Sequence, residues 1–203
     1  MNFGELKDRA LQLAFSYSLA GSPVPATYNN QADYIAMIPG LVNSAEMDIA
    51  TTKRRIPKTV RLSELEHSAS GAWEVYSFPE DCWQMMQGGL LRLDAIHPRR
   101  FTGYMVGLGK KLYMPAGMSA EEYLLEYWRY PEKVSSDTPD DTELDNEPET
   151  HECVVYYVAS GLLSYDDAYR SQVFRTEYEQ RSARLREEIW LEPQPILNRY
   201  HGE

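Results

Sequence analysis

Residues 151–190 constrain the fold of this chain most strongly, because two helices of opposite character follow one another there. From Cys153 to Leu163 nearly every residue is apolar, and a helix that is apolar on all sides is usually buried on all sides. The helix that follows is polar, with a thin apolar line along it: Tyr169, Val173, Phe174, Tyr178, Leu185 and Ile189. We therefore expect a buried helix over 148–163 and a mostly exposed helix over 166–190 that reaches out of its own domain.

The residues before each of these helices indicate how the helices begin. Ser164 or Asp166 can cap the exposed helix. Upstream, residues 134–150 are acidic and rich in turn formers, which suggests either a calcium loop or a capping segment. The spacing of the aspartates does not match an EF-hand, and the central glycine is missing. We favour Thr142 or Asp145 as the cap of the helix that begins near Pro148.

Two more helices are predicted at the N-terminal end, over 2–19 and 31–53. The first begins with Asn2 and Glu5, which have the spacing of a capping box. The second contains Pro39-Gly40 inside its apolar pattern, so a kink or a break is expected there.

The middle of the chain, about 58–131, consists of short stretches of aromatic and β-branched residues separated by glycine or proline. We expect four or five strands there, in a small and mostly antiparallel sheet. Residues 80–91, EDCWQMMQGGLL, differ: Pro79 can open a helix and Gly88-Gly89 can end one, so a short helix is predicted. The predicted fold class is α+β, a bundle of two N-terminal and two C-terminal helices with the sheet inserted between them.

The predicted domain organisation is a single domain over 1–190 followed by an extended tail over 191–203. Pro193 and Pro195 prevent a helix in the tail, which nevertheless carries apolar residues: Leu191, Ile196, Leu197 and Tyr200. Such a segment can add a strand to a partner or occupy a groove on it. The alternatives are a tail that folds back on its own domain or one that is disordered.

Charge limits the classes of partner. The formal net charge of −11 argues against broad binding of nucleic acid or anionic membranes by the whole surface. One local exception is a basic patch: Lys53, Arg54, Arg55, Lys58 and Arg61. This patch either contacts DNA or an acidic partner, or it consists of ordinary solvated cations at a helix end. No apolar run approaches the ~18 residues of a membrane span, and the first residues lack the pattern of a signal peptide. We expect a soluble protein that is intracellular when made, with no membrane partner.

The sequence contains no motif that indicates catalysis. It has no glycine-rich phosphate loop, no GxSxG and no HExxH, and its four histidines lie far apart. Cys82 and Cys153 form neither a disulfide framework nor a zinc site. We expect a binding or assembly protein without catalytic residues, metal or cofactor; the alternative is an enzyme whose residues converge only in the fold.

Two segments resemble a known family. FPEDCWQM (78–85) is similar to the turn between a strand and a short helix in the head-to-tail connector, or adaptor, proteins of tailed bacteriophages. YYVASGLLSYDDAYRSQVFRTEYE (156–179) is similar to the paired C-terminal helices of that family. The order of elements agrees over nearly the whole chain.

The resemblance implies a structural virion protein that is made and assembled in the host bacterial cytoplasm. Such proteins form a ring, usually dodecameric, that docks under the portal, extends the DNA channel without sequence-specific DNA binding, and carries neck or tail proteins. By position, 191–203 is the portal-docking tail. The buried helix, with Val154, Tyr157, Val158 and Leu162, is core with one face toward a neighbouring subunit. The alternative function is a DNA-contacting packaging or regulatory factor that uses the basic patch.

Overall fold

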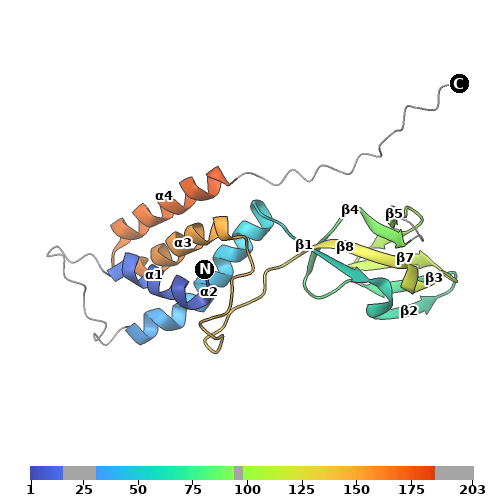
Figure 1. The fold of residues 1–203 in the computed structure, drawn as a ribbon, viewed down its shortest axis with the longest axis horizontal. Coiled ribbons are helices and arrows are strands. Elements are labelled where there is room, and N and C mark those ends of the chain that lie inside the picture. The colour runs from blue at the N-terminus through green and yellow to red at the C-terminus, as the bar shows by residue number, and fades with distance from the viewer. Residues whose placement is uncertain (16–30, 94–97, 186–203) are drawn as a thin grey trace, which may run out of the picture.

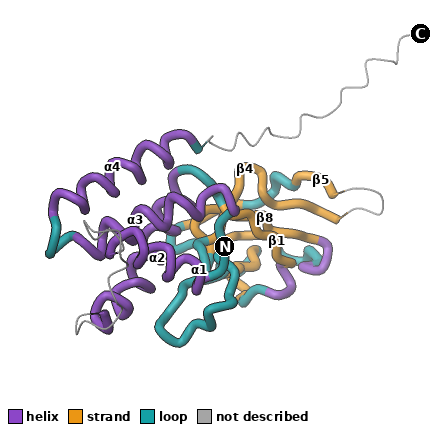
Figure 2. Tube along the Cα trace, turned by 60° about the vertical axis from the view of Figure 1, so that its left-hand side comes forward, coloured by secondary structure: helices purple, strands orange, loops and turns teal. Residues whose placement is uncertain are grey.

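The computed structural model describes residues 1–15, 31–93 and 98–185 as an elongated molecule with helices at one end and strands at the other (Figure 1). The helical part contains four α-helices: α1 (Phe3–Phe15), α2 (Gln31–Thr52), α3 (His151–Leu163) and α4 (Ala168–Arg184). The β part contains eight strands: β1 (Ile56–Arg61), β2 (His67–Ser70), β3 (Trp73–Ser77), β4 (Cys82–Leu93), β5 (Pro98–Arg100), β6 (Met105–Gly107), β7 (Lys111–Pro115) and β8 (Tyr123–Arg129). Seen from another side, the helices again lie mainly toward one end and the strands toward the other, although the two groups partly overlap in this view (Figure 2).

The β part consists of two four-stranded sheets in which all neighbouring strands are antiparallel. One sheet has the order β1-β8-β4-β5 and the other has the order β2-β3-β7-β6. The two sheets share one hydrophobic core, to which both contribute buried side chains: Leu62, Tyr76, Cys82, Leu90, Leu112, Met114, Tyr123, Leu125 and Tyr127. Because alternate residues of a strand point to opposite faces, each sheet buries one face and exposes the other.

The helical part has its own core, with α3 at its centre. Helices α1, α2 and α4 all pack against α3. The buried side chains of this core come from every helix and from the acidic segment: Phe3, Leu6, Ala10, Ala14, Ile38, Val42, Ala45, Ile49, Val134, Leu144, Cys153, Val154, Val155, Val158, Leu162, Leu163 and Tyr178. The expectation of a buried helix next to a more exposed one is met, since α4 buries only Tyr178.

The predicted fold class is wrong about the sheet. In place of four or five strands in one small sheet, the described residues form eight strands in two sheets with a core of their own. The predicted short helix over 80–91 is the long strand β4, which pairs with β8. Gly88, with φ of 65°, lies at an irregularity of this strand, and a Cβ on Gly89 would lie 2.4 Å from the carbonyl oxygen of Glu126. The two glycines therefore allow a bulge against β8 instead of ending a helix.

The proline in α2 does not break the helix, which continues through Pro39-Gly40. Pro39 cannot donate the hydrogen bond of that turn, and burial of Ile38, Val42 and Ile49 on the same helix offsets the loss. The capping box at the start of α1 is confirmed: the Glu5 backbone N–H donates to Asn2 Oδ1 at 2.8 Å, and the Asn2 backbone nitrogen lies 3.1 Å from Glu5 Oε2.

The acidic segment covers the start of α1 and does not cap α3 as predicted. The backbone N–H groups of Phe3 and Gly4 donate to the carbonyl oxygens of Thr142 and Asp140, each at 2.8 Å. Asp145 instead binds Arg129 at the end of β8. The segment therefore links the N-terminal helix to the end of the sheet.

The cap of α4 was also misassigned. Asp167, and neither Ser164 nor Asp166, accepts the hydrogen bond of the cap, from the backbone N–H of Arg170 at 3.0 Å. Asp166 accepts from the hydroxyl of Tyr34 on α2, and the Ser164 hydroxyl donates to the carbonyl oxygen of Gly161.

Candidate interaction surfaces

The basic patch lies where α2 passes into β1, and most of its charges have acidic or aromatic partners within the chain. Arg54 pairs with Glu147 at 3.3 Å and with Glu149 at 3.2 Å. Lys58 pairs with Asp81 at 2.7 Å, and Arg61 lies 3.7 Å from Glu121.

Arg55 has another kind of partner, since its guanidinium lies over the rings of Trp83 and Trp128 at 5.5 and 5.8 Å. Lys53 is half-buried next to these residues. Arg54 thus links the end of α2 to the segment before α3, while the pairs of Lys58 and Arg61 lie within the β part. Contact of the patch with DNA or an acidic partner stays a prediction.

The four residues expected on the inner helix lie on two sides of α3. Val154, Val158 and Leu162 are buried in the helical core. Tyr157 is half-buried and faces α4, where its ring meets that of Tyr178 edge-on with centroids 5.0 Å apart. Contact of any of these residues with a neighbouring subunit stays a prediction.

Arginines of α4 cover the tyrosines of α3. Arg175 lies over the rings of Tyr157 and Tyr178 at 4.8 and 5.1 Å. Arg181 lies over the ring of Tyr156 at 4.3 Å and donates to its hydroxyl at 3.3 Å. Burial and a hydrogen bond to Asp48 on α2 raise the pKa of Tyr178. These contacts hold a mostly polar helix on the core with little apolar burial.

The predicted docking tail, with Leu191, Pro193, Pro195, Ile196, Leu197 and Tyr200, lies outside the described residues. The helix that leads to it ends at Arg184, and Leu185 packs partly against the helical core.

A buried carboxyl group lies at the junction between the two parts. Glu46 on α2 is buried, and burial, with the nearby charge of Asp145, raises its pKa to about 7. Asp145 itself binds Arg129 through both carboxylate oxygens and accepts from the backbone N–H of Glu132 at 2.8 Å. Next to it, the Asn146 side chain donates to the carbonyl oxygen of Glu46 at 3.3 Å. Sequence patterns did not indicate this cluster, because Glu46 lies 83 to 100 positions from its other members.

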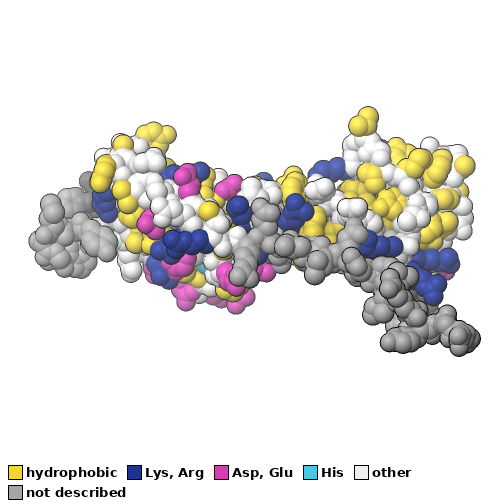
Figure 3. Space-filling view, turned by 90° about the horizontal axis from the view of Figure 1, so that it is seen from above, with side chains coloured by type: hydrophobic (Ala, Val, Ile, Leu, Met, Phe, Trp, Pro, Cys, Tyr) yellow, Lys and Arg dark blue, Asp and Glu magenta, His cyan; other side chains and the backbone are white. Residues whose placement is uncertain are grey.

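Two exposed apolar surfaces were missed. On the β part, Met105, Val106 and Leu108 lie on the β6–β7 hairpin and are exposed. Near the start of α4, Tyr165 just before the helix and Tyr169 and Val173 on its first turns are exposed, although Tyr169 and Val173 belonged to the apolar line predicted along this helix. Figure 3 shows apolar side chains gathered over the β part and acidic side chains gathered over the helical part.

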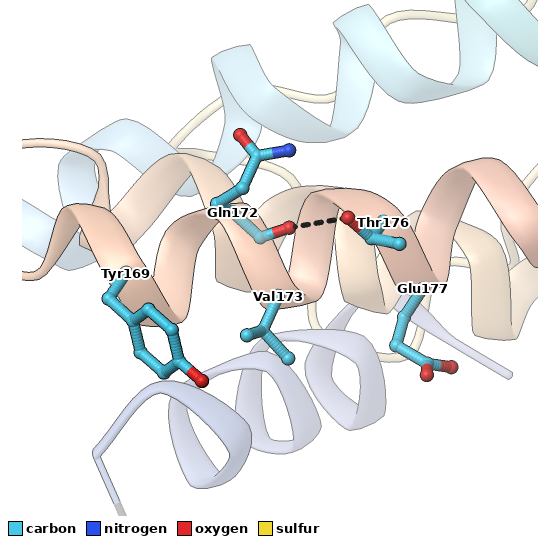
Figure 4. A pocket seen from close by; sticks show the side chains of 5 residues that line it. All are labelled: Tyr169, Gln172, Val173, Thr176 and Glu177. Carbon is cyan, nitrogen blue, oxygen red and sulfur yellow. Dashed lines mark hydrogen bonds between the residues drawn. The ribbon is translucent and has the colours of Figure 1, made fainter.

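The surface of α4 is hollowed beside Tyr169. Tyr169, Gln172, Val173, Thr176 and Glu177 line an open recess of about 220 Å³ (Figure 4). In this view Tyr169, Val173 and Glu177 project from the same side of the helix. Small-molecule pockets are usually larger, from about 300 Å³, so this recess suits a protein side chain better than a ligand.

Within the described ranges, neither a metal site nor a reactive cysteine is found. These ranges contain no group of three or more His, Cys, Asp or Glu residues that could hold a metal ion. Burial raises the pKa of the Cys82 thiol to about 11 and also raises that of Cys153, so neither is a reactive thiolate at neutral pH. Within the same ranges no helix is both long and apolar enough to cross a membrane.

Comparison with known proteins decides the family. The family model of the SU10 adaptor protein matches residues 1–195. The chain belongs to this family. The adaptor is thus a structural protein of the bacteriophage virion, as the resemblance of its sequence predicted, and proteins of this kind interact with portal and tail proteins. A search of curated proteins finds no match to the adaptor.

Proposed function

We propose that copies of this adaptor form a ring under the portal, extend the DNA channel and provide a platform for the next neck or tail protein. The family match over residues 1–195 carries the proposal, because it covers nearly the whole chain. Twelve is the copy number that the resemblance to connector proteins favours. The genome passes through the ring without sequence-specific contacts.

The distribution of charge supports a role around DNA that has to move. Residues 53–129 carry eleven Lys and Arg and nine Asp and Glu, whereas the other 126 residues carry nine and twenty-two. DNA binds proteins largely through its phosphates, and acidic surfaces repel them. An acidic helical part is suited to a channel along which DNA slides without adhering.

The tail 191–203 is the segment we assign to the portal. Its apolar residues Ile196, Leu197 and Tyr200 are the anchors, and Pro193 and Pro195 keep the backbone extended. Helix α4 supports this role, because it lies on the outside of the helical part and ends just before the tail (Figure 1).

Electron microscopy of the adaptor mixed with purified portal tests the proposal. The full chain is expected to form a ring on the portal, and a chain lacking 191–203 is expected to lose it. A chain in which only Ile196, Leu197 and Tyr200 are replaced by serine should behave like the truncated one, and Glu203→Gln serves as the matched control.

Binding that survives the truncation contradicts the docking tail. An adaptor that never forms rings on the portal contradicts the proposed function. If that adaptor also binds DNA in a salt-sensitive way that is lost on neutralising residues 53–61, the alternative of a DNA-contacting packaging factor takes its place.

A further inference from the structure

The exposed apolar side chains of the β part are concentrated on one hairpin. Leu108 at its tip is 98% exposed, and Met105 and Val106 on β6 are about half exposed. Met105 and Val106 are neighbours in a strand and point to opposite faces of the sheet, so Leu108 is the apolar side chain that the hairpin presents at its tip. A large apolar side chain left fully in water at the tip of a hairpin is available to another protein.

The hairpin is preformed. Gly107 pairs with Lys111 in the antiparallel ladder, and Gly109 and Lys110 take positive φ angles of 73° and 56° to close the turn. The Lys110 side chain donates to the carbonyl oxygen of Cys82 on β4, which ties the turn to the neighbouring sheet. Leu108 therefore projects from a fixed base, and little conformational entropy is lost when it is bound.

The second apolar surface has the complementary shape. Tyr165, just before α4, and Tyr169 are 90% and 80% exposed. Tyr169 and Val173 lie four residues apart on α4, which places them along one face of the helix. The recess beside Tyr169 and Val173 measures about 220 Å³ and is open to solvent. Tyrosines beside a shallow recess are typical of the centre of a protein interface.

The charges beside the two surfaces are opposite. Lys110 and Lys111 follow Leu108 in the hairpin. Asp166 and Asp167 lie between the two tyrosines in sequence and supply the negative charge on the α4 side. Glu177 also lines the recess, where it pairs with Arg181 at 3.4 Å. The nearest cation on this helix, Arg170, is directed to α1, where it donates to the carbonyl oxygen of Leu13 at 3.0 Å. Contact of hairpin with hairpin, or of α4 with α4, would oppose like charges, whereas hairpin on α4 pairs unlike ones.

We propose that the β6–β7 hairpin of one adaptor docks on the α4 face of a second copy, with Leu108 in the recess beside Tyr169 and Val173. The two surfaces belong to opposite ends of the elongated subunit, so one copy cannot satisfy both by itself (Figure 1). Each contact leaves one hairpin and one α4 face unoccupied, and such a head-to-tail contact adds further copies until a ring closes. The inference rests on the proposed ring and assigns its subunit contact.

Two substitutions test the contact, Leu108→Glu on the hairpin and Tyr169→Glu on α4, with Ile35→Glu as a control at an exposed apolar residue outside both surfaces. All three positions are exposed, and circular dichroism checks that each variant is folded. Analytical ultracentrifugation and electron microscopy on the portal measure assembly. Each test variant is expected to weaken self-association by roughly 30-fold or more, the effect of losing one interface anchor of about 2 kcal/mol. The control is expected to assemble like the unsubstituted adaptor.

The mixture of the two variants is the decisive experiment. Leu108→Glu retains an intact α4 face and Tyr169→Glu retains an intact hairpin, so the mixture is expected to form dimers and nothing larger. A mixture that stays monomeric contradicts the pairing of these two surfaces. Full rings from either variant alone contradict the inference but leave the proposed ring intact, whereas an unsubstituted adaptor that forms no ring on the portal contradicts both.

Discussion

The two parts of the adaptor differ in how the chain builds them. The β part is one continuous segment, residues 53–131, and the helical part is assembled from two segments on either side of it. Strands β1 and β8 pair along their whole length, with Ile56 opposite Arg129. The end of α2 and the start of the acidic segment are therefore brought together by the sheet. The β part can close its core alone, whereas the helical part depends on the sheet to hold its halves together.

The charges differ as well. The β part is close to neutral and carries the exposed hairpin, whereas the helical part holds most of the negative charge. The two parts meet through paired groups, Arg129 with Asp145 and Arg54 with Glu147 and Glu149. The comparison indicates that the β part supports the fold of the helical part and that charge pairs hold the junction.

Truncating a core side chain in each part tests most directly whether the helical part depends on the β part. Leu125→Ala in the β core and Leu162→Ala in the helical core each remove a fully packed side chain, and each is expected to cost about 2–5 kcal/mol of stability. Because opening the sheet separates the two helical segments, Leu125→Ala should increase amide hydrogen exchange in both parts, and Leu162→Ala in the helical part alone.

Mass spectrometry of peptides from the two parts measures this exchange. Equal loss of protection in both parts with Leu162→Ala would show that residues 1–190 unfold as the single cooperative domain predicted from the sequence.

Glu46→Gln tests the buried carboxyl group at the junction between the two parts. The pKa of Glu46 is about 7 in the folded protein and near 4.5 when unfolded, so the folded state holds its proton more tightly. Stability therefore falls as pH rises from about 4.5, and above about pH 7 the ionised carboxyl costs about 3 kcal/mol. The Glu46→Gln variant cannot ionise at this position. Its free energy of unfolding, relative to that of the unsubstituted adaptor, should therefore rise between about pH 4.5 and pH 7.

Urea unfolding at pH 5 and pH 8 measures the effect, with the exposed Glu64→Gln as the control. A difference between variant and unsubstituted adaptor that does not change with pH contradicts the assignment.

Asp145→Asn tests the charge pair that joins β8 to the acidic segment. Loss of a charge-assisted bidentate contact is expected to cost about 1–3 kcal/mol. The same change removes the negative charge of Asp145, which helps to raise the pKa of Glu46, and so should lower that pKa. Urea unfolding gives the stability and NMR titration gives the pKa; Asp137→Asn, on the exposed side of the acidic segment, is the control. An unchanged pKa of Glu46 would show that burial alone raises it.

Asp167→Ala has the smallest expected effect, about 1 kcal/mol, because it removes the cap of α4. Because α4 belongs to the helical part, amide hydrogen exchange should increase in the first turn of α4 and not in the sheets. The exposed Asp141→Ala provides the control in thermal unfolding. Equal changes in both variants would mean that general surface charge, and not the cap, is responsible.

Local patterns predicted the helices well and the strands poorly. The apolar run of α3 and the Asn2–Glu5 capping box depend on residues within a few positions of one another, so their structure could be predicted. The helix predicted at residues 80–91 had proper start and stop signals, but pairing with β8, some 40 positions away, made it a strand. Likewise, Asp145 is a residue type that often caps helices, but its contact with Arg129 at the end of β8 gave it a different role.

The exposed apolar surfaces also differ in how far local patterns could predict them. The stretch VGLGKK (106–111) has two glycines, which favour a hairpin turn, and a leucine between them is a usable signal that Leu108 is exposed. Tyr169 and Val173 were assigned to the same apolar line as Phe174 and Tyr178, since the order of residues along a helix does not say which side the core covers.

The sequence by itself indicated the adaptor family, through two segments that resemble it. It also determined the central buried helix and the polar helix beside it, because these depend on composition and on spacing along one element. Only the tertiary structure decided that the middle is a two-sheet unit, that Arg54 and Arg129 join it to the helices, and that Tyr169 faces solvent. The physical reason is that these features depend on contacts between residues far apart in the chain, which no local pattern records.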